Sequence, residues 1–245
     1  TWPSPIDMGT SEKDRMECPQ QNIDSKTPQF GGRCNYGAEL ENLDRLMKKT
    51  VEKVESLGEL DKTLVCITGD HGEMLGDYGF HGKKVPWQAS ISVPLICFGP
   101  GVAPGNVFED PVTTLDLGGT FMDLAGVPLG PDMTTKSLRS ILQGQKVANR
   151  DFVASGLKDW RVVVKKVGDT SYKLVCCKGD CQKTPKTVPQ ENTNWQMLLY
   201  DTTNDHYDMH PIWNKPAILR ELQPHLPKGW CPREDPMVAH RLTRD

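Results

Sequence analysis

The spacing of apolar residues along the chain first predicts a helix and then a strand. Within residues 36–57, apolar side chains recur every three or four positions, which is typical of an amphipathic helix, and Gly58 can end it. Residues 63–67 form a short run rich in β-branched side chains that Gly69 follows, and this predicts a buried parallel strand. The helical positions are Leu40, Leu43, Met47, Val51 and Val54.

The later pattern changes from long elements to short strands. The apolar run at residues 93–98 predicts a second strand, residues 113–126 predict a helix capped by Thr113 or Thr114, and residues 137–142 predict a short helix. Beyond Asn149, short apolar runs between turn residues predict a small antiparallel sheet, and residues 217–226 predict a closing helix. The short runs lie at residues 153–155, 161–164, 172–176 and 196–200.

These elements predict an α/β fold: part of a mixed sheet flanked by helices, followed by a small antiparallel sheet with a packed helix. Residues 1–35 are rich in polar residues and Pro without any period, so we expect a long loop segment there. Residues 36–148 would form the α/β part, and residues 149–245 a small antiparallel α+β subdomain.

Composition and charge restrict the classes of partner that we expect for the chain. The formal net charge of −3 gives no electrostatic reason to expect nucleic acid or an anionic membrane as a partner. No apolar stretch approaches the roughly 20 residues that span a bilayer. The chain begins at Thr1, without an initiator Met or a signal peptide, so we expect a processed product or a piece of a longer protein.

The cysteines indicate an oxidising compartment. Two of them lie in the predicted strands, where free Cys usually packs as a small hydrophobe. Three cluster within residues 176–181 without the paired spacing of a zinc site, so disulfides in a secreted, lysosomal/lumenal or periplasmic chain are the better interpretation, with the pairing left open. Cys18 and Cys34 flank a polar loop that a disulfide can close. The eight cysteines are Cys18, Cys34, Cys66, Cys97, Cys176, Cys177, Cys181 and Cys231.

Candidate chemistry gathers at the end of the first predicted strand. Asp70 and His71 follow the strand directly, where ligands bind in open α/β sheets, and together they can hold a metal ion. Lys83, 12 residues after His71, can return to the same crevice and meet an anion. The alternative is that Asp70 merely caps the next turn. A hard cation needs further oxygens, for which Glu73 and Asp77 are candidates, whereas imidazole suits transition metals.

A wider pattern surrounds these residues. Its parts are Asp70-His71-Gly72-Glu73-Met74-Leu75-Gly76-Asp77, His81-Gly82-Lys83, Trp87 and Val93-Pro94-Leu95-Ile96. In order and spacing this pattern closely resembles the carboxyl-terminal half of sulfatases, metal-dependent hydrolases of the alkaline-phosphatase-like superfamily. The resemblance covers about residues 36–226, so residues 36–148 would be the carboxyl-terminal part of the sulfatase catalytic domain.

The resemblance implies a role for each candidate. Asp70 looks like the metal-ligating aspartate, and His71 occupies the next ligand position. The ion is typically Ca²⁺ in such proteins, and sometimes Mg²⁺ or Mn²⁺. Lys83 resembles the lysine that contacts the transferring sulfate, with Lys84 as the alternative if the loop shifts by one residue. His81 is a candidate proton donor, although a solvated loop histidine is the simpler interpretation.

The sequence also departs from the family. In sulfatases the nucleophile is a formylglycine made from Cys or Ser, within a Cys/Ser-x-Pro/Ala-x-Arg signature that is absent here. The early Asp-Asp metal pair is absent as well, and both belong to the amino-terminal half of relatives. Gln88 and Ser92 replace a common Glu and Arg. We therefore expect the chain to supply part of the metal site and the sulfate-binding lysine, and to need an amino-terminal half or partner chain.

Three functions compete at this point. The first is a sulfatase chain that acts on a sulfate ester, with sulfated sugars among the candidates. The second is a phosphonate monoester or phosphodiester hydrolase of the same superfamily, and the third is a non-catalytic sulfatase-like module for binding or structural packing. Trp2, Trp87, Trp160 and Trp195 can line a sugar-binding cleft, although core or surface packing is the commoner use of tryptophan.

Overall fold

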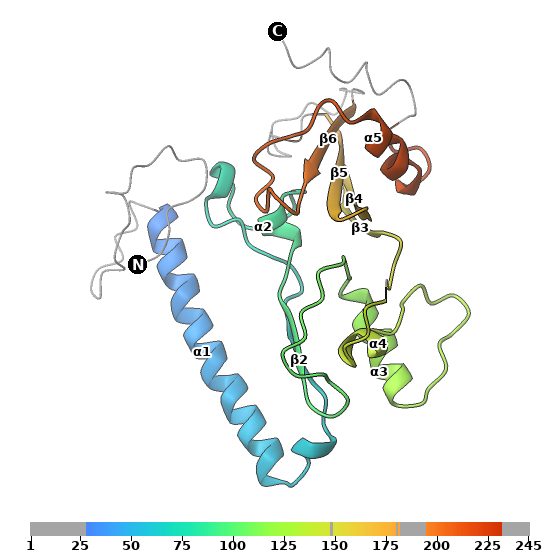
Figure 1. Ribbon diagram of the computed structural model, residues 1–245. Coiled ribbons are helices and arrows are strands. Elements are labelled where there is room, and N and C mark those ends of the chain that lie inside the picture. Colours follow the sequence, from blue (N-terminus) through green and yellow to red (C-terminus); the bar gives the residue numbers. More distant parts are fainter. Residues whose placement is uncertain (1–27, 148, 180, 182–194, 232–245) are drawn as a thin grey trace.

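The computed structural model describes residues 28–147, 149–179, 181 and 195–231. Along the chain these residues form a long helix, a two-stranded sheet, a helical unit and a four-stranded sheet (Figure 1). The α/β fold class predicted from the sequence is confirmed. Cys18 and Trp2, and the side chain of Cys34, lie outside the described residues.

The long helix α1 (Pro28–Ser56) begins eight residues before the predicted start at Tyr36. The end of the segment expected to be a loop is therefore helical. Gly58 follows the helix with a φ of 68°, a left-handed conformation that glycine adopts without strain. The apolar face of α1 is only partly covered by the described residues, since Leu40 and Leu43 are 44% and 49% exposed.

Strands β1 (Val65–Thr68) and β2 (Leu95–Phe98) form the two-stranded sheet, with 3-10 helix η2 (Leu60–Lys62) before β1. The two strands pair antiparallel, so the expectation of a parallel strand was wrong. Cys66 lies opposite Cys97, and the two form a disulfide rather than packing as free thiols. Their Cα atoms are 4.2 Å apart, the close approach of a non-hydrogen-bonded antiparallel pair.

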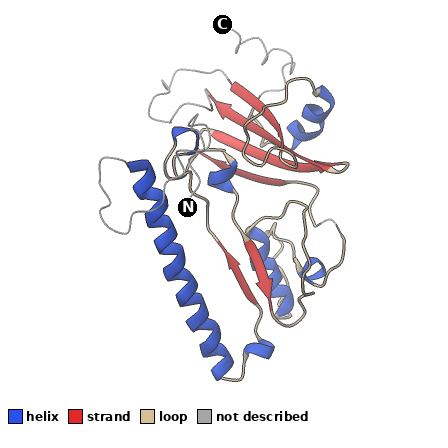
Figure 2. Ribbon diagram, turned by 60° about the vertical axis from the view of Figure 1, so that its left-hand side comes forward, coloured by secondary structure: helices blue, strands red, loops and turns tan. Residues whose placement is uncertain are grey.

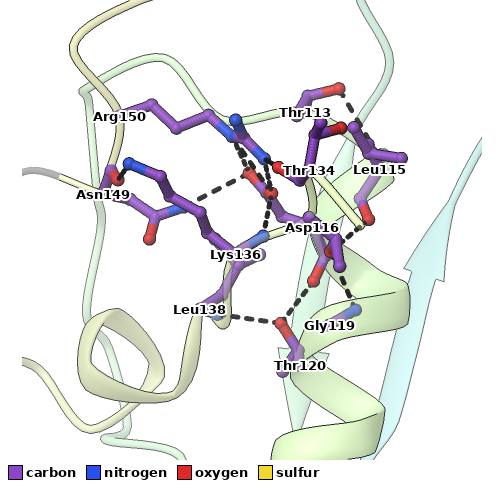
Figure 3. Close-up of polar contacts among 11 residues, drawn as sticks. Thr113, Leu115, Asp116, Gly119, Thr120, Thr134, Lys136, Leu138, Asn149 and Arg150 are labelled. Carbon is purple, nitrogen blue, oxygen red and sulfur yellow. Dashed lines mark hydrogen bonds and ion pairs between the residues drawn. The ribbon is translucent and has the colours of Figure 1, made fainter. Parts of the chain in front are cut away.

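The helical unit contains α3 (Leu115–Leu124) and α4 (Arg139–Leu142), close to the predicted helices. The carboxylate of Asp116 is fully buried in the first turn of α3, where it accepts hydrogen bonds from Arg150, from Nδ2 of Asn149 at 3.2 Å and from the backbone of Lys136 at 2.8 Å (Figure 3). A buried charge is stable only when it is paired in this way. Through these contacts α3 is bonded to Asn149 and Arg150, where the second subdomain was expected to start.

The second sheet is an antiparallel meander of β3 (Val153–Leu157), β4 (Trp160–Val167), β5 (Thr170–Lys178) and β6 (Trp195–Asp201), which confirms the predicted antiparallel sheet. Its side chains alternate between two cores. One face packs against α5 (Pro216–Leu222) and 3-10 helix η4 (Gln223–His225), as Figure 2 shows. The other face, with Val162 and Val175, packs against Met74, Phe80 and Trp87 of the loop that joins β1 to β2.

The alternation of side chains between the two faces of β5 also determines which cysteines can pair. Cys176 and Cys177 are adjacent and therefore point to opposite faces of the sheet. Cys176 bonds to Cys231 near α5, and Cys177 bonds to Cys181. The disulfides predicted for the cysteines within residues 176–181 are thus present, in pairs that the sequence had left open.

A buried ion pair joins the second sheet to the loop. Nζ of Lys173 lies 2.6 Å from the carboxylate of Asp208, and both side chains are fully buried. The same carboxylate oxygen accepts the backbone N–H of Gln88 at 2.7 Å, at the start of α2 (Gln88–Ile91). Burial lowers the pKa of Lys173 and raises the pKa of Asp208, because each charge has lost its water.

Candidate functional site

The loop between β1 and β2 folds back on itself and carries the candidate site. Gly72 donates its backbone N–H to the Ser90 carbonyl at 2.9 Å, and a Cβ at Gly72 would lie 2.0 Å from the Ala89 carbonyl oxygen. Only glycine lets the strand end approach α2 so closely. Further along the loop, both backbone groups of Gly82 form hydrogen bonds to earlier loop residues. The Gly82 carbonyl accepts the N–H of Met74 at 2.8 Å, and the Gly82 N–H donates to the Glu73 carboxylate.

This folding brings Asp70, His71 and Lys83 together. The backbone N–H of His71 donates to the Asp70 carboxylate at 3.0 Å, and Nε2 of His71 lies 3.1 Å from Oδ2 of the same carboxylate. Nζ of Lys83, 12 residues further along the loop, contacts that same Nε2. Asp70 is 84% exposed and His71 37%, so the cluster is open to a ligand.

The tautomer of His71 follows from its neighbours. Nδ1 lies 2.9 Å from the carbonyl oxygen of Gly72, and a carbonyl only accepts, so Nδ1 carries the proton. In the neutral ring Nε2 then presents its lone pair beside the Asp70 carboxylate. The ammonium group of Lys83, which can only donate, contacts Nε2, so this nitrogen serves as the acceptor.

The donor chemistry fits part of a metal shell. An imidazole nitrogen and a carboxylate oxygen are both ligands that divalent cations accept. Among the described residues, no third His, Cys, Asp or Glu joins Asp70 and His71 in a cluster that could hold a metal ion. Two protein ligands leave most of the coordination shell to be supplied by other groups.

The remaining candidates lie elsewhere. His81 is exposed and hydrogen-bonds to none of the other described residues. Lys84 is also exposed, has a φ of 86°, and its side chain forms no hydrogen bond or ion pair with Asp70 or His71. Asp77, proposed as an extra oxygen ligand, instead pairs with Arg33 of α1 at 2.6 Å, and the Glu73 carboxylate binds loop N–H groups.

A groove with a volume of about 710 Å³ begins at Asp70 and runs toward the second sheet. Trp87 and Trp160 do not line it: both are buried, at 3% and 8% exposure, in the core between sheet and loop. Trp195 packs edge-on against Trp230 at 5.1 Å and does not line the groove either, so these three candidate tryptophans do not form a sugar-binding cleft there. Lining residues include Asp70, Ser92, Thr114, Ser155, Val164 and His206.

Two residues that support the site were missed from the sequence. Arg33 donates to the Leu75 carbonyl at 2.9 Å, and the indole N–H of Trp160 donates to the Lys84 carbonyl at 2.8 Å. These contacts span 42 and 76 residues, so no local pattern marks them.

Comparison with known proteins gives the family of the chain. The family model Sulfatase matches residues 8–127, and the model N-sulphoglucosamine sulphohydrolase, C-terminal, matches residues 76–229. The second match alone covers well over half of the chain. The chain belongs to the sulfatase family and has the alkaline-phosphatase-like fold of its members.

Relatives of several activities share this part of the sequence. The chain is 34% identical over 113 residues to the extracellular sulfatase SULF-1 homolog of Drosophila melanogaster, covering 46% of the chain and 10% of that protein. It is 34% identical over 120 residues to the choline-sulfatase of Rhizobium meliloti (strain 1021), covering 49% and 23%. It is 36% identical over 105 residues to human N-acetylglucosamine-6-sulfatase, covering 42% and 19%.

Solved structures agree on the fold. BT4656, in complex with its substrate D-glucosamine-2-N,6-O-disulfate, superposes with a TM-score of 0.62 at 22% identity, covering 76% of the chain and 38% of that protein. The phosphonate monoester hydrolase of Agrobacterium radiobacter superposes with a TM-score of 0.60 at 20% identity, covering 79% and 40%. The chain therefore spans less than half the length of these relatives.

Proposed function

We propose that the chain is part of a sulfuric ester hydrolase in which Asp70 and His71 hold a divalent cation and Lys83 binds the sulfate group. One observation carries the proposal: Nζ of Lys83 contacts Nε2 of His71 beside the Asp70 carboxylate, although 12 residues separate the lysine from the histidine. Ca²⁺ is the first candidate for the ion, with Mg²⁺ and Mn²⁺ as alternatives.

The chemistry of sulfate ester cleavage calls for these groups. Negative charge develops on the sulfuryl oxygens in the transition state, and the ammonium group of Lys83 stabilises it by donating hydrogen bonds. When bound by Asp70 and His71, a divalent cation supplies further positive charge at the same place. His81, in the exposed turn before Lys83, is the proposed donor of a proton to the leaving alcohol.

The nucleophile is proposed to be a formylglycine on an amino-terminal half that packs against this chain. Uncovered apolar faces of the described residues support such a partner. Leu43 and Leu46 on α1 are 49% and 60% exposed, and Ile96 on β2 is 58% exposed at the surface of a sheet of two strands. Small sheets with bare apolar faces are unstable in water unless another element covers them.

We propose a sulfate ester as substrate, with sulfated sugars as the first class to test. The groove beside Asp70 offers space for the alcohol part of such an ester. A secreted or lumenal location fits the three disulfides among the described residues and the extracellular sulfatases among the relatives. The helices of the described chain include none with the length and apolar character of a membrane span.

The test compares two neighbouring lysines in the complete enzyme, that is, the chain together with its amino-terminal half. With an aryl sulfate as substrate, Lys83→Ala should lower kcat by about 10²–10³, the cost of removing one group that stabilises an oxyanion. Lys84→Ala is the matched control and should leave kcat within about twofold, because its side chain is exposed and outside the cluster.

Other outcomes would contradict the proposal in different ways. A larger loss in Lys84→Ala than in Lys83→Ala would move the sulfate-binding role to Lys84. A large preference for aryl phosphate or phosphonate esters over aryl sulfate would favour the phosphorus-ester hydrolase. Absence of both hydrolysis and bound metal would favour the non-catalytic module.

A further inference from the structure

We propose that Trp160 is a positioning residue for Lys83: its indole N–H holds the loop backbone from which the lysine reaches the site. The inference rests on the proposed function of Lys83. Nε1 of Trp160 donates to the carbonyl oxygen of Lys84 at 2.8 Å, so the second sheet contacts the loop at the residue directly after Lys83.

The backbone at Lys84 needs such a partner. Its φ of 86° lies in a region that side chains with a Cβ rarely adopt, at a cost of roughly 1–3 kcal/mol. The side chain of Lys84 is exposed and forms no ion pair with a described residue, so side-chain contacts do not explain the conformation. Strained backbone of this kind persists where surrounding contacts hold it, and such positions cluster at functional sites.

Lys83 therefore lies between two anchored residues. On one side Gly82 is fixed by the Glu73 carboxylate and by the N–H of Met74. On the other side Lys84 is fixed by Trp160. With both neighbours held, the direction in which the Lys83 side chain leaves the loop is set before any ligand binds.

Trp160 is itself held rigidly. It is the first residue of β4, is 8% exposed, and pairs in register with Cys177, which forms a disulfide with Cys181. Its ring belongs to the core that also contains Met74 and Val85, on either side of the lysine in sequence. The second sheet thus supplies a fixed hydrogen-bond donor for a loop whose core side chains are buried and whose candidate residues Asp70, His71 and Lys83 are exposed.

The first test is Trp160→Phe in the complete enzyme, which keeps an aromatic ring in the core and removes the N–H donor. Displacing a catalytic group by about 1 Å costs up to roughly a hundredfold in rate. We expect kcat for an aryl sulfate to fall about tenfold to a hundredfold, with a smaller change in KM. Trp195→Phe is the matched control, because Trp195 packs against the opposite face of the same sheet, and it should keep the wild-type kcat.

A second variant separates positioning from packing. Glycine adopts a φ of 86° without strain, so Lys84→Gly added to Trp160→Phe should restore part of the lost kcat. If Trp160→Phe acted only by loosening the core, Lys84→Gly would restore nothing, and this result would overturn the proposal.

A third measurement does not depend on activity. Hydrogen–deuterium exchange of the peptide spanning residues 73–85 reports the hydrogen-bonded N–H groups of Met74 and Gly82. Exchange there should be faster in Trp160→Phe than in wild type and unchanged in Trp195→Phe. Unchanged loop exchange and unchanged kcat in Trp160→Phe would overturn the inference. If wild type hydrolysed no sulfate ester, the proposed function would fail, and the exchange result would still decide whether Trp160 holds the loop.

Discussion

Nζ of Lys83 contacts Nε2 of His71, and the same ring nitrogen lies 3.1 Å from the carboxylate of Asp70. A cation and two acceptors meet at one exposed point of the molecule. Since His71 carries its proton on Nδ1, toward the Gly72 carbonyl, its lone pair and the Asp70 oxygen are both turned to this point. This is the point at which we propose that a divalent cation and the sulfate group bind.

Asp70→Asn should weaken binding of the proposed divalent cation in the complete enzyme. The amide oxygen is a weaker ligand than the carboxylate, and we expect kcat/KM to fall at least about a hundredfold because the cation contributes several kcal/mol of charge stabilisation. Bound metal, measured by inductively coupled plasma mass spectrometry, should fall in parallel. The control is Asp61→Asn, an exposed carboxylate of η2. Full metal content in Asp70→Asn would contradict the assignment.

Gly72→Ala should disrupt the site, whereas Gly118→Ala should not. The new Cβ at residue 72 would lie 2.0 Å from the Ala89 carbonyl oxygen, a backbone atom that cannot move away without displacing α2. We expect a loss of about 1–3 kcal/mol in the free energy of unfolding and weaker binding of the proposed cation.

Gly118 supplies the matched control for that substitution. It lies inside α3, and a Cβ there would meet nothing within 4 Å. Alanine is a better helix former than glycine by about 0.5–1 kcal/mol, so Gly118→Ala should stabilise the protein slightly. Chemical unfolding measures the free energy of unfolding of both variants. Equal free energies would show that the backbone around residue 72 moves to accommodate the added Cβ at no cost.

Lys173→Met should be strongly destabilising because it leaves the Asp208 carboxylate buried without its cation. The expected cost is about 3–5 kcal/mol, measured by chemical unfolding at neutral pH. Lys173→Met combined with Asp208→Asn removes both charges and should recover a large part of this loss, since asparagine also tolerates the φ of 58° at residue 208. A double variant no more stable than the single one would argue against an unpaired charge as the cause.

The ion pair of Lys165 with Asp151 should give a defined pH dependence of stability. Nζ of Lys165 lies 2.7 Å from Asp151 and 3.0 Å from Glu221. The hydrogen bond from Lys165 lowers the pKa of Asp151 below its ordinary 3.8, and the hydrogen bond to Asp151 raises the pKa of Lys165 above its ordinary 10.5. Stabilisation is therefore fully present between these ordinary values, and is lost as pH falls through the lowered value or rises through the raised one.

Asp151→Asn tests this pH window. The variant should be less stable than wild type at neutral pH by at most about 1 kcal/mol, because Asp151 is largely exposed and water screens the pair. The difference should shrink toward zero in acid. Asp159→Asn, which changes an exposed carboxylate that forms no ion pair with a described residue, is the control. A difference that grew as the pH fell below 3.8 would have the wrong sign for this pair.

The sequence alone determined most of the helices and strands and the segment that carries the candidate site. Helical spacing placed α1, α3 and α5, and alternating runs placed the four strands of the second sheet, because each pattern reports which face of a local segment is apolar. The adjacency of Asp70 and His71 after β1 is likewise a local fact. The ordered motifs around them also indicated the sulfatase family, which the comparisons bear out.

The tertiary structure determined which residues far apart in the sequence come into contact. It paired β1 antiparallel with β2 and joined Cys66 to Cys97, although either strand alone is compatible with several partners. It also brought the indole N–H of Trp160 into hydrogen-bonding distance of the Lys84 carbonyl, 76 residues earlier in the chain. Such contacts depend on how apolar faces of similar character pack together. Their energies are set by the shape and burial of side chains in the assembled core, and a local periodicity in the sequence does not encode these properties.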